Sequence, residues 1–196
     1  QTVGTHFKTV SLDPPSFPEA PYIPPDSMGD VGPTQILVHL NGYIKVFNKS
    51  GVLGALSATD DVFWNSVRTV NGESDPHIRY DRIAKRWVVV CIDVSSASNY
   101  VLIAVSNDSV ITGTGSFTFF RFAHDAVGGG TSDNGGFADY PTLGVDANAL
   151  YICVNVFNAA GTAVFAIYIA DSVGYTGSVG AQLFKDLAHL TGISRT

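Results

Sequence analysis

Aspartates recur at corresponding places along the chain and are its strongest chemical signal. Asp75 and Asp139 each have a proline within two residues, followed by a short apolar segment and a second aspartate (Asp81 and Asp146). A weaker copy of the pattern starts at Asp26. Equivalent carboxylates brought together by a repeated fold would repel one another, and a hard cation such as Ca²⁺ relieves that repulsion through oxygen ligands.

This pattern predicts Asp26, Asp75 and Asp139 as ligands of a Ca²⁺ ion. The alternative is that each aspartate accepts hydrogen bonds from the backbone of its own turn, next to a proline that serves the same turn.

A glycine-rich connection at 124–138 is the second candidate site, because loops of this length without regular structure are often functional. Asp125, Asp133 and Asn134 could ligate a cation or line a groove, and the ring of Tyr140 could stack on a sugar. We therefore predict these four as ligand-binding residues. The alternative is a loop that only links two sheets, with Tyr140 packed between them.

Motifs of the common enzyme classes are missing from the sequence. It has no Gly-x-Ser-x-Gly, no His-Glu-x-x-His, no phosphate-binding loop, no dinucleotide fingerprint and no sialidase Asp box. We therefore favour a non-enzymatic protein. The enzymatic alternative is a hydrolase of glycans or peptides that uses the repeated aspartates with His77 or Arg79, since glycosidases need two carboxyl groups roughly 5–9.5 Å apart.

Composition excludes several classes. Of 196 residues, 45% are hydrophobic and 14% charged, with a net charge of -6, so the chain is too apolar to be disordered and too acidic to bind nucleic acid by bulk charge. Its longest apolar stretch, 163–170, is too short to span a membrane as a helix. The start at Gln1 is expected of either a mature chain after signal removal or an excised fragment, and the low lysine content with abundant Thr, Ser, Gly and Asn favours a secreted, extracellular protein. Cys91 and Cys153 lie in apolar runs and are predicted to be buried thiols rather than a disulfide.

Short segments rich in β-branched and aromatic residues predict an antiparallel all-β fold. The predicted strands are Ile36–Leu40, Tyr43–Asn48, Trp87–Asp93, Tyr100–Ser106, Ser116–Phe122, Leu150–Phe157 and Ala163–Ala170. Asn41-Gly42 is typical of a tight hairpin turn between the first two. Residues Ser57–Trp64 are predicted to form a short helix with Ser57 as N-cap, and Ala181–Leu190 either a helix or a final strand.

The repetition organises these strands into units of about four, which is typical of a β-propeller. The predicted divisions are an N-terminal extension (1–25), a first blade (26–72), a second blade (73–123), the glycine-rich connection and a third blade (139–196). In such a blade the segment after the first aspartate lies innermost, and the run Trp87–Ile92 is buried on both faces. A β-sandwich is the alternative fold, although it gives no reason for the repeated aspartates.

Three motifs in this order resemble a family of secreted bacterial β-propeller modules. They are Pro-Pro-Asp-x-Met-Gly-x-Val-Gly-Pro at 24–33, Asp-Pro-x-x-x-Tyr-Asp-x-x-x-x-x-Trp at 75–87 and Asp-Tyr-Pro-x-Leu-Gly at 139–144. The resemblance covers residues 22–157. It implies a propeller fold and export from the cell, and it implies no particular chemistry.

Propellers close with about four to eight blades, so three blades predict a missing partner. That partner is either the remaining blades of a larger propeller or another protein chain, unless Thr5–Leu12 closes the ring as an extra strand. The function we expect is a secreted scaffold or binding module that recognises a glycan, another surface ligand or a protein through loops on one face. A structural surface or filament subunit is a further alternative.

Overall fold

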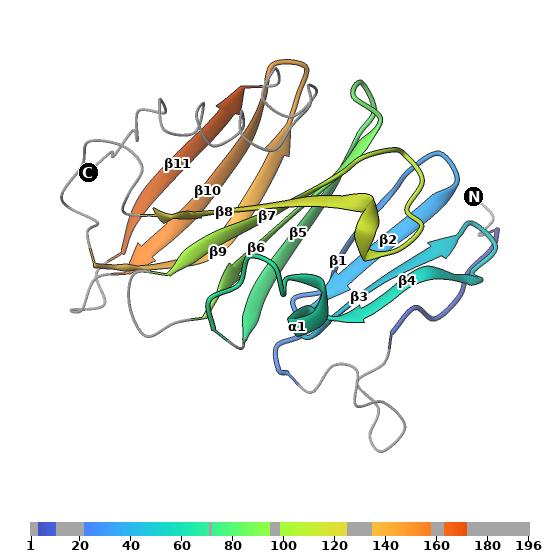
Figure 1. The fold of residues 1–196 in the computed structure, drawn as a ribbon, viewed down its shortest axis with the longest axis horizontal. Helices are drawn as coiled ribbons and strands as arrows, with labels where there is room; N and C mark the ends of the chain where they lie inside the picture. Colours follow the sequence, from blue (N-terminus) through green and yellow to red (C-terminus); the bar gives the residue numbers. More distant parts are fainter. Residues whose placement is uncertain are drawn as a thin grey trace.

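The computed structural model describes residues 4–10, 22–70, 72–94, 99–124 and 135–157, together with the backbone of 163–171. Its strands form three antiparallel sheets (Figure 1). The first sheet contains β1 (Met28–Val31), β2 (Gln35–Leu40), β3 (Tyr43–Asn48) and β4 (Leu53–Thr59). The second contains β5 (Glu73–Asp81), β6 (Arg86–Asp93), β7 (Tyr100–Ser106) and β8 (Phe117–Ala123), and the third contains β9 (Phe137–Val145), β10 (Ala149–Phe157) and β11 (Ala163–Asp171). The prediction of an antiparallel all-β protein is confirmed.

Local sequence explains the strand order, because short turns join strands that pair with their chain neighbours. The hairpin of β2 and β3 turns at Asn41-Gly42, where Gly42 has a φ of 100° that a side chain would disfavour. The seven strands predicted from apolar segments are all present, and their bounds differ from the prediction by at most one residue at either end.

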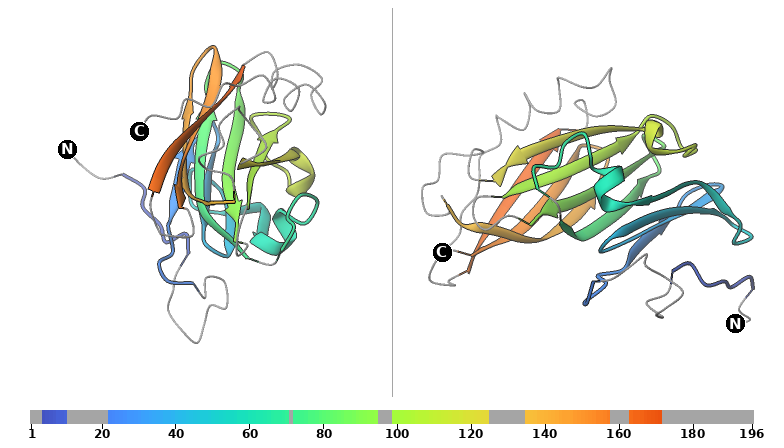
Figure 2. Two further views of the ribbon diagram at one scale, coloured as in Figure 1. Left: turned by 90° about the vertical axis from the view of Figure 1, so that its left-hand side faces the viewer. Right: turned by 60° about the horizontal axis from the view of Figure 1, so that its bottom comes forward.

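The three sheets stack face to face, with the second sheet between the other two (Figures 1 and 2). Alternate residues of its strand β6 point to opposite sides: Trp87, Val89 and Cys91 pack toward the first sheet, whereas Val88 and Val90 pack toward the third. The predicted burial of this run on both faces is therefore confirmed.

The first strand of each sheet lies next to the first strand of the following sheet, since β1 contacts β5 and β5 contacts β9. This arrangement gathers the beginnings of the three strands at one end of the stack and their ends at the other. Within the described residues the stack is open, and no closed ring or barrel is formed.

The third sheet is covered on one face only by the rest of the described chain. In β10, Ile152 and Val154 are buried against the second sheet, whereas the alternating residues Tyr151, Cys153 and Phe157 are half-buried. The strand that corresponds to the doubly buried β6 therefore has an incompletely covered outer face.

Two local expectations are wrong. Helix α1 (Asp60–Phe63) is present, but Ser57 belongs to β4 and Thr59 precedes the helix without a side-chain cap, because pairing with Lys45 of β3 keeps Ser57 in the sheet. Residues 4–10 form no strand.

The N-terminal residues instead pack on the first sheet. The Phe7 ring lies 5.5 Å from the ring of Phe47 in β3, where an apolar contact is available to it. The predicted closing strand Thr5–Leu12 is therefore not formed at residues 5–10. Its last two residues and the segment Ala181–Leu190 lie outside the described residues. In the described part of the chain, no helix is long and apolar enough to cross a membrane.

Candidate functional site

The three predicted aspartates meet at one cavity, where the first strands of the sheets begin. Asp26, Asp75 and Asp139 line a space of about 430 Å³ together with Asn41 and Glu73. We call this the acidic cavity. The repeat therefore brings together carboxylates that lie 49 and 64 residues apart in the sequence.

A strained backbone marks the same position in each sheet. Asp26, Asp75 and Tyr140 have φ angles of 41°, 57° and 49°, in the left-handed region that few non-glycine residues adopt. In β5 and β9 this residue sits in a bulge directly before a proline, and the strand returns to regular pairing after it.

The bulges correct the predicted equivalence of the aspartates by one residue. Asp139 pairs with Asn155 as Ser74 pairs with Ile92, and the next residue in each strand, Tyr140 or Asp75, enters the bulge. The residue equivalent to Asp75 is therefore Tyr140, because the prolines that follow them set the register. Asp139 still lines the cavity from the adjacent position.

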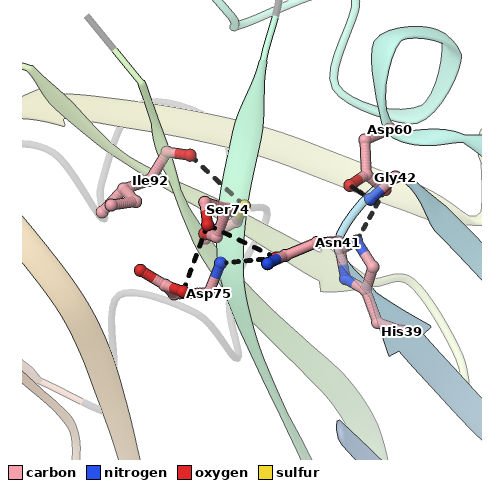
Figure 3. Close-up of polar contacts among 8 residues, drawn as sticks. His39, Asn41, Gly42, Asp60, Ser74, Asp75 and Ile92 are labelled. Carbon is pink, nitrogen blue, oxygen red and sulfur yellow. Dashed lines mark hydrogen bonds and ion pairs between the residues drawn. The ribbon is translucent and has the colours of Figure 1, made fainter. Parts of the chain in front are cut away.

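Asn41 connects the first two sheets across the cavity (Figure 3). Its Oδ1 accepts a hydrogen bond from the backbone N–H of Asp75 at 2.9 Å and a longer one from the Ser74 hydroxyl at 3.4 Å. Its Nδ2 donates to Oδ2 of Asp26 at 2.7 Å and to the carbonyl of Pro24 at 3.0 Å. The amide thus satisfies the bulge of β5 and holds the Asp26 carboxylate in place.

Asp75 makes the corresponding connection between the second and third sheets. The backbone N–H of Tyr140 donates to Oδ2 of Asp75 at 3.3 Å, so a side chain of one sheet again caps the bulge of the next. The Asp75 carboxylate therefore accepts a backbone hydrogen bond, which was the alternative to a metal ligand. The N–H that it accepts belongs to the neighbouring sheet, however, and not to its own turn.

The Asp75 carboxyl is also in a strongly acidic environment. Its residue is 9% exposed. Burial is the largest cause that raises the pKa of Asp75, which reaches about 6. A hydrogen bond with the Asp26 carboxyl and the charge of Asp139 raise this pKa further, whereas a hydrogen bond from Ser74 lowers it. Close carboxylates of this kind keep a proton or attract a cation.

Glu73 extends the acidic surface toward α1. Its side chain is 1% exposed, and its Oε1 has no hydrogen-bond partner, with the Arg68 Nε at 3.9 Å. The pKa of Glu73 is raised to about 7 by burial and by the charges of Asp60 and Asp61, while Arg68 lowers it. Glu73 lines the acidic cavity and a smaller neighbouring pocket, which also contains Asp60 and Asp61.

Asp60 itself is committed to structure. Its Oδ1 lies 2.8 Å from Nε2 of the fully buried His39, and its Oδ2 accepts the N–H of Gly42 at 2.7 Å (Figure 3). The His39 ring stacks beside Trp64, which is also fully buried. This almost fully buried His–Asp pair holds α1 against the β2–β3 turn.

Tyr140 is accessible at the same end of the stack. It is 47% exposed, and its ring contacts the buried ring of His77 edge-on, with 5.6 Å between centroids. Burial, followed by the charge of Arg79, lowers the pKa of His77, so this ring is uncharged at neutral pH. The predicted ligand-binding residues Asp125, Asp133 and Asn134 lie outside the described residues.

In the described part of the chain, no group of three or more His, Cys, Asp or Glu side chains is placed to hold a metal ion. Cys91 and Cys153 are free thiols, as predicted, but only Cys91 is buried as predicted and Cys153 is half-buried. Cys91 is buried and donates to the Ser74 carbonyl at 3.0 Å, so it supports the strand that carries Asp75.

Sequence reasoning missed Asn41, Glu73 and Asp60. The sequence predicts only a turn role for Asn41, and the hydrogen bond to Asp75 shows that its side chain reaches the neighbouring sheet, where β1 contacts β5. A signal for Glu73 was present, since it precedes the Ser74-Asp75-Pro76 segment within the same strand. Nothing in the local sequence indicated that Asp60 would meet His39.

Comparison with family models, with curated proteins and with solved structures finds no match for this chain. The functional argument therefore rests on the residues of the acidic cavity and on the sheets that position them.

Proposed function

We propose that the chain is a secreted β-propeller-type binding module that recognises its ligand at the acidic cavity. The observation that carries this proposal is that Asp26, Asp75 and Asp139, from three successive sheets, line one cavity. Its position at the beginnings of three adjacent first strands corresponds to the mouth of the central channel in a propeller. The resemblance of three ordered motifs to secreted bacterial propeller modules supports the same assignment.

The chemistry of the cavity favours a cationic ligand. Among the described residues, four carboxylates (Asp26, Asp75, Asp139 and Glu73) and no basic side chain line this space, and Oε1 of Glu73, which has no hydrogen bond, lies 3.9 Å from Nε of Arg68. A divalent cation of the Ca²⁺ class accepts carboxylate oxygens and tolerates irregular geometry, with water completing its coordination. We propose that Ca²⁺ binds between Asp26 and Asp75, where burial first and then the neighbouring carboxyl groups raise the pKa of Asp75, and that it offsets the negative charge gathered there.

Binding, rather than catalysis, explains how the surrounding groups are used. Asn41 and Asp75 are occupied in capping the bulges of neighbouring sheets, and His39 is sealed in the core. These side chains therefore hold neighbouring sheets together at the cavity wall. Exposed Tyr140 adds an aromatic surface beside it, on which a sugar or a peptide side chain could stack.

Completion of the ring is part of the proposal. The incompletely covered face of β10 presents Tyr151, Cys153 and Phe157. A further antiparallel sheet stacked on this face would bury them, as the third sheet buries one face of β6. We propose that the remaining blades of a larger propeller, or a second chain, cover this face.

Calcium binding is tested by urea unfolding of the 196-residue chain at pH 8, with 5 mM Ca²⁺ or with chelator. We expect Ca²⁺ to raise the free energy of unfolding, as ligand binding to the folded state requires. Asp26→Asn and Asp75→Asn should each lose the effect. Asp146→Asn, which removes an exposed aspartate at the other end of the stack, is the matched control and should retain it. An equal calcium effect in all four proteins, or none in the parent chain, contradicts the proposed site.

One observation favours a second function, a glycoside hydrolase. An Asp75 carboxyl with a pKa of about 6 beside a second carboxylate has the properties of a general acid. This alternative predicts that the parent chain releases reducing sugar from a panel of extracellular glycans, and that Asp75→Asn remains folded but inactive. The binding module predicts no turnover by either protein.

A further inference from the structure

A second cavity, of opposite charge, lies at the other end of the same strands. It has a volume of about 550 Å³, and its wall includes Lys49, Arg82, Lys85, Tyr80 and Ser109. We call it the basic cavity. Seven residues separate Asp75 from Arg82, which is about 20 Å along an extended strand. The two cavities are therefore distinct sites, and the inference below does not depend on the function proposed for the acidic one.

Different turns bring these basic side chains together. Lys49 is in the turn between β3 and β4, and Arg82 and Lys85 are in the turn between β5 and β6. Ser109 comes from the connection between β7 and β8. Two sheets thus contribute to one concave surface, and no single stretch of sequence carries the charge pattern.

The charge of this cavity is unusual for the protein as a whole. The chain has a net charge of -6 and eleven Lys and Arg residues, of which three line this one cavity, and no carboxylate is among its lining residues. The ion pairs found in the described chain do not include Lys49, Arg82 or Lys85. These three exposed side chains carry like charges around one cavity, and an anion between them would be attracted to all three.

Acidic groups are present nearby, but backbone hydrogen bonds engage them. Oδ1 of Asp81 accepts the N–H groups of Ile83 and Ala84, at 2.7 and 3.0 Å. Asp30 accepts the N–H of Tyr80 at 2.7 Å, and its other oxygen accepts the N–H of Val31. Asp108 likewise accepts hydrogen bonds from Ser109. These carboxylates shape the turns, and they do not line the cavity.

A buried hydroxyl adds a donor to the wall. Tyr80 is 9% exposed, and its hydroxyl lies beside Ser109 without a hydrogen bond of ordinary geometry. Burial raises the pKa of Tyr80, so the hydroxyl keeps its proton at physiological pH. A buried donor without a partner is costly, and a ligand oxygen would satisfy it.

The wall that carries this hydroxyl is rigid. The Tyr80 ring packs on Trp87 with 4.9 Å between centroids, and the Trp87 indole donates to the Ser109 carbonyl at 2.9 Å. Gly32 lies so close to Trp87 that a Cβ there would stand 2.5 Å from the indole ring. The cavity floor is therefore held in place before any ligand arrives, which lowers the entropy cost of binding.

We propose that the basic cavity is a binding site for a tetrahedral oxyanion, phosphate or sulfate, free or carried as an ester on a larger ligand. Lys49, Arg82 and Lys85 supply the positive charge, and the Tyr80 hydroxyl supplies a directed hydrogen bond. A volume of about 550 Å³ exceeds what a single inorganic ion fills and leaves room for the group that carries it. The net charge of -6 opposes an extended polyanion such as nucleic acid, so the cavity fits one anionic group rather than a chain of them.

Isothermal titration calorimetry of the 196-residue chain at pH 7 tests the proposal, at constant ionic strength set with chloride. The probes are sodium phosphate, sodium sulfate and glucose 6-phosphate. We expect saturable binding of at least one probe. A glucose 6-phosphate affinity at least tenfold above that of phosphate would identify an ester-bearing ligand as the source, whereas comparable affinities would identify the free ion.

The variant Lys49→Gln/Arg82→Gln/Lys85→Asn removes the three charges. Asparagine is chosen at 85 because Lys85 has a φ of 57° that asparagine tolerates. We expect its affinity for the bound probe to fall at least tenfold. Arg79→Gln is the matched control, since Arg79 is an exposed arginine three residues from Arg82 that does not line the cavity, and it should bind like the parent chain.

Two results would overturn the inference: no probe binds above the chloride background, or the triple variant binds as tightly as Arg79→Gln. Circular dichroism of each variant establishes that it is folded. Asp75→Asn, at the acidic cavity, should leave oxyanion binding unchanged, so failure of one proposed site is distinguishable from failure of the other.

Discussion

Replacing Asp75 by asparagine removes one negative charge from the acidic cavity and keeps an oxygen that can accept the N–H of Tyr140. The substitution therefore separates two roles of this side chain. Its charge is opposed by burial and by the Asp26 and Asp139 carboxylates, whereas its hydrogen bond supports the bulge of the third sheet. Each role predicts a different dependence of stability on pH.

The charge effect has a definite sign. The pKa of Asp75 is raised from 3.8 to about 6 in the folded protein, so the folded state holds the proton more tightly than the unfolded chain does. The contribution of this tighter proton binding to the free energy of unfolding is fully present below pH 3.8 and is lost as the pH rises through about 6. A shift of this size corresponds to about 3 kcal/mol at full strength. Because the side chain borders a cavity open to water, screening reduces it to about 1.5 kcal/mol.

We therefore expect Asp75→Asn to be about 1.5 kcal/mol more stable than the parent chain at pH 8 without calcium, and equal to it near pH 4. Urea unfolding followed by tryptophan fluorescence measures this difference, because Trp64 and Trp87 are both fully buried and become exposed on unfolding. Urea carries no charge and leaves the electrostatic interactions unscreened. Glu73 titrates in an overlapping range, so the difference between the two proteins isolates Asp75.

Asp146→Asn is a control of opposite sign. The N–H groups of Asn148 and Ala149 lower the pKa of this exposed aspartate, so its replacement should destabilise the protein at neutral pH and have less effect in acid. If Asp75→Asn is instead less stable than the parent by the same amount from pH 4 to pH 8, Asp75 acts only as a hydrogen-bond acceptor, and the reasoning from carboxylate repulsion is refuted.

Further predictions concern the parts of the structure that support the two cavities. Gly32→Ala should cost about 1–3 kcal/mol of unfolding free energy in urea, since its Cβ would overlap Trp87, and an unchanged stability would contradict that contact. Asn41→Ala should cost about 2 kcal/mol, because the N–H of a buried bulge loses its acceptor. A loss below about 0.5 kcal/mol, the scale of a surface substitution, would show that the bridge between sheets is unimportant. In a thiol titration of the native chain at pH 8, half-buried Cys153 should react, whereas Cys91 should react only after unfolding. The reason is that burial raises the pKa of the Cys91 thiol well above its usual range. Prompt reaction of both thiols would contradict the burial of β6.

Much of the fold could be predicted because its signals are local. Short apolar segments separated by Gly, Asn and Asp define the strands, and the continuous apolar run of β6 indicated a strand covered on both faces. Predictions failed where pairing with a distant strand prevailed over a local motif. Ser57 has the sequence of a helix N-cap, yet it pairs with Lys45 in the sheet.

The candidate site was predictable in kind but not in detail. Repetition of the aspartates indicated that they would converge, and they do line one cavity. Their register was off by one residue at Asp139, because a bulge beside a proline changes the pairing by one position without altering the composition of the motif. The bridging amide of Asn41 could not be foreseen, since its partner lies 34 residues away in another sheet.

The sequence by itself therefore determined the strands, their hairpin order and the repetition of acidic residues, all of which depend on neighbours in the chain. Only the tertiary structure decided which of these residues meet. Face-to-face stacking placed three first strands side by side, so that carboxylates gathered at one end and Lys49, Arg82 and Lys85 at the other. Electrostatic interactions act through space over a few ångströms, and that distance is set by packing between sheets rather than by separation along the chain.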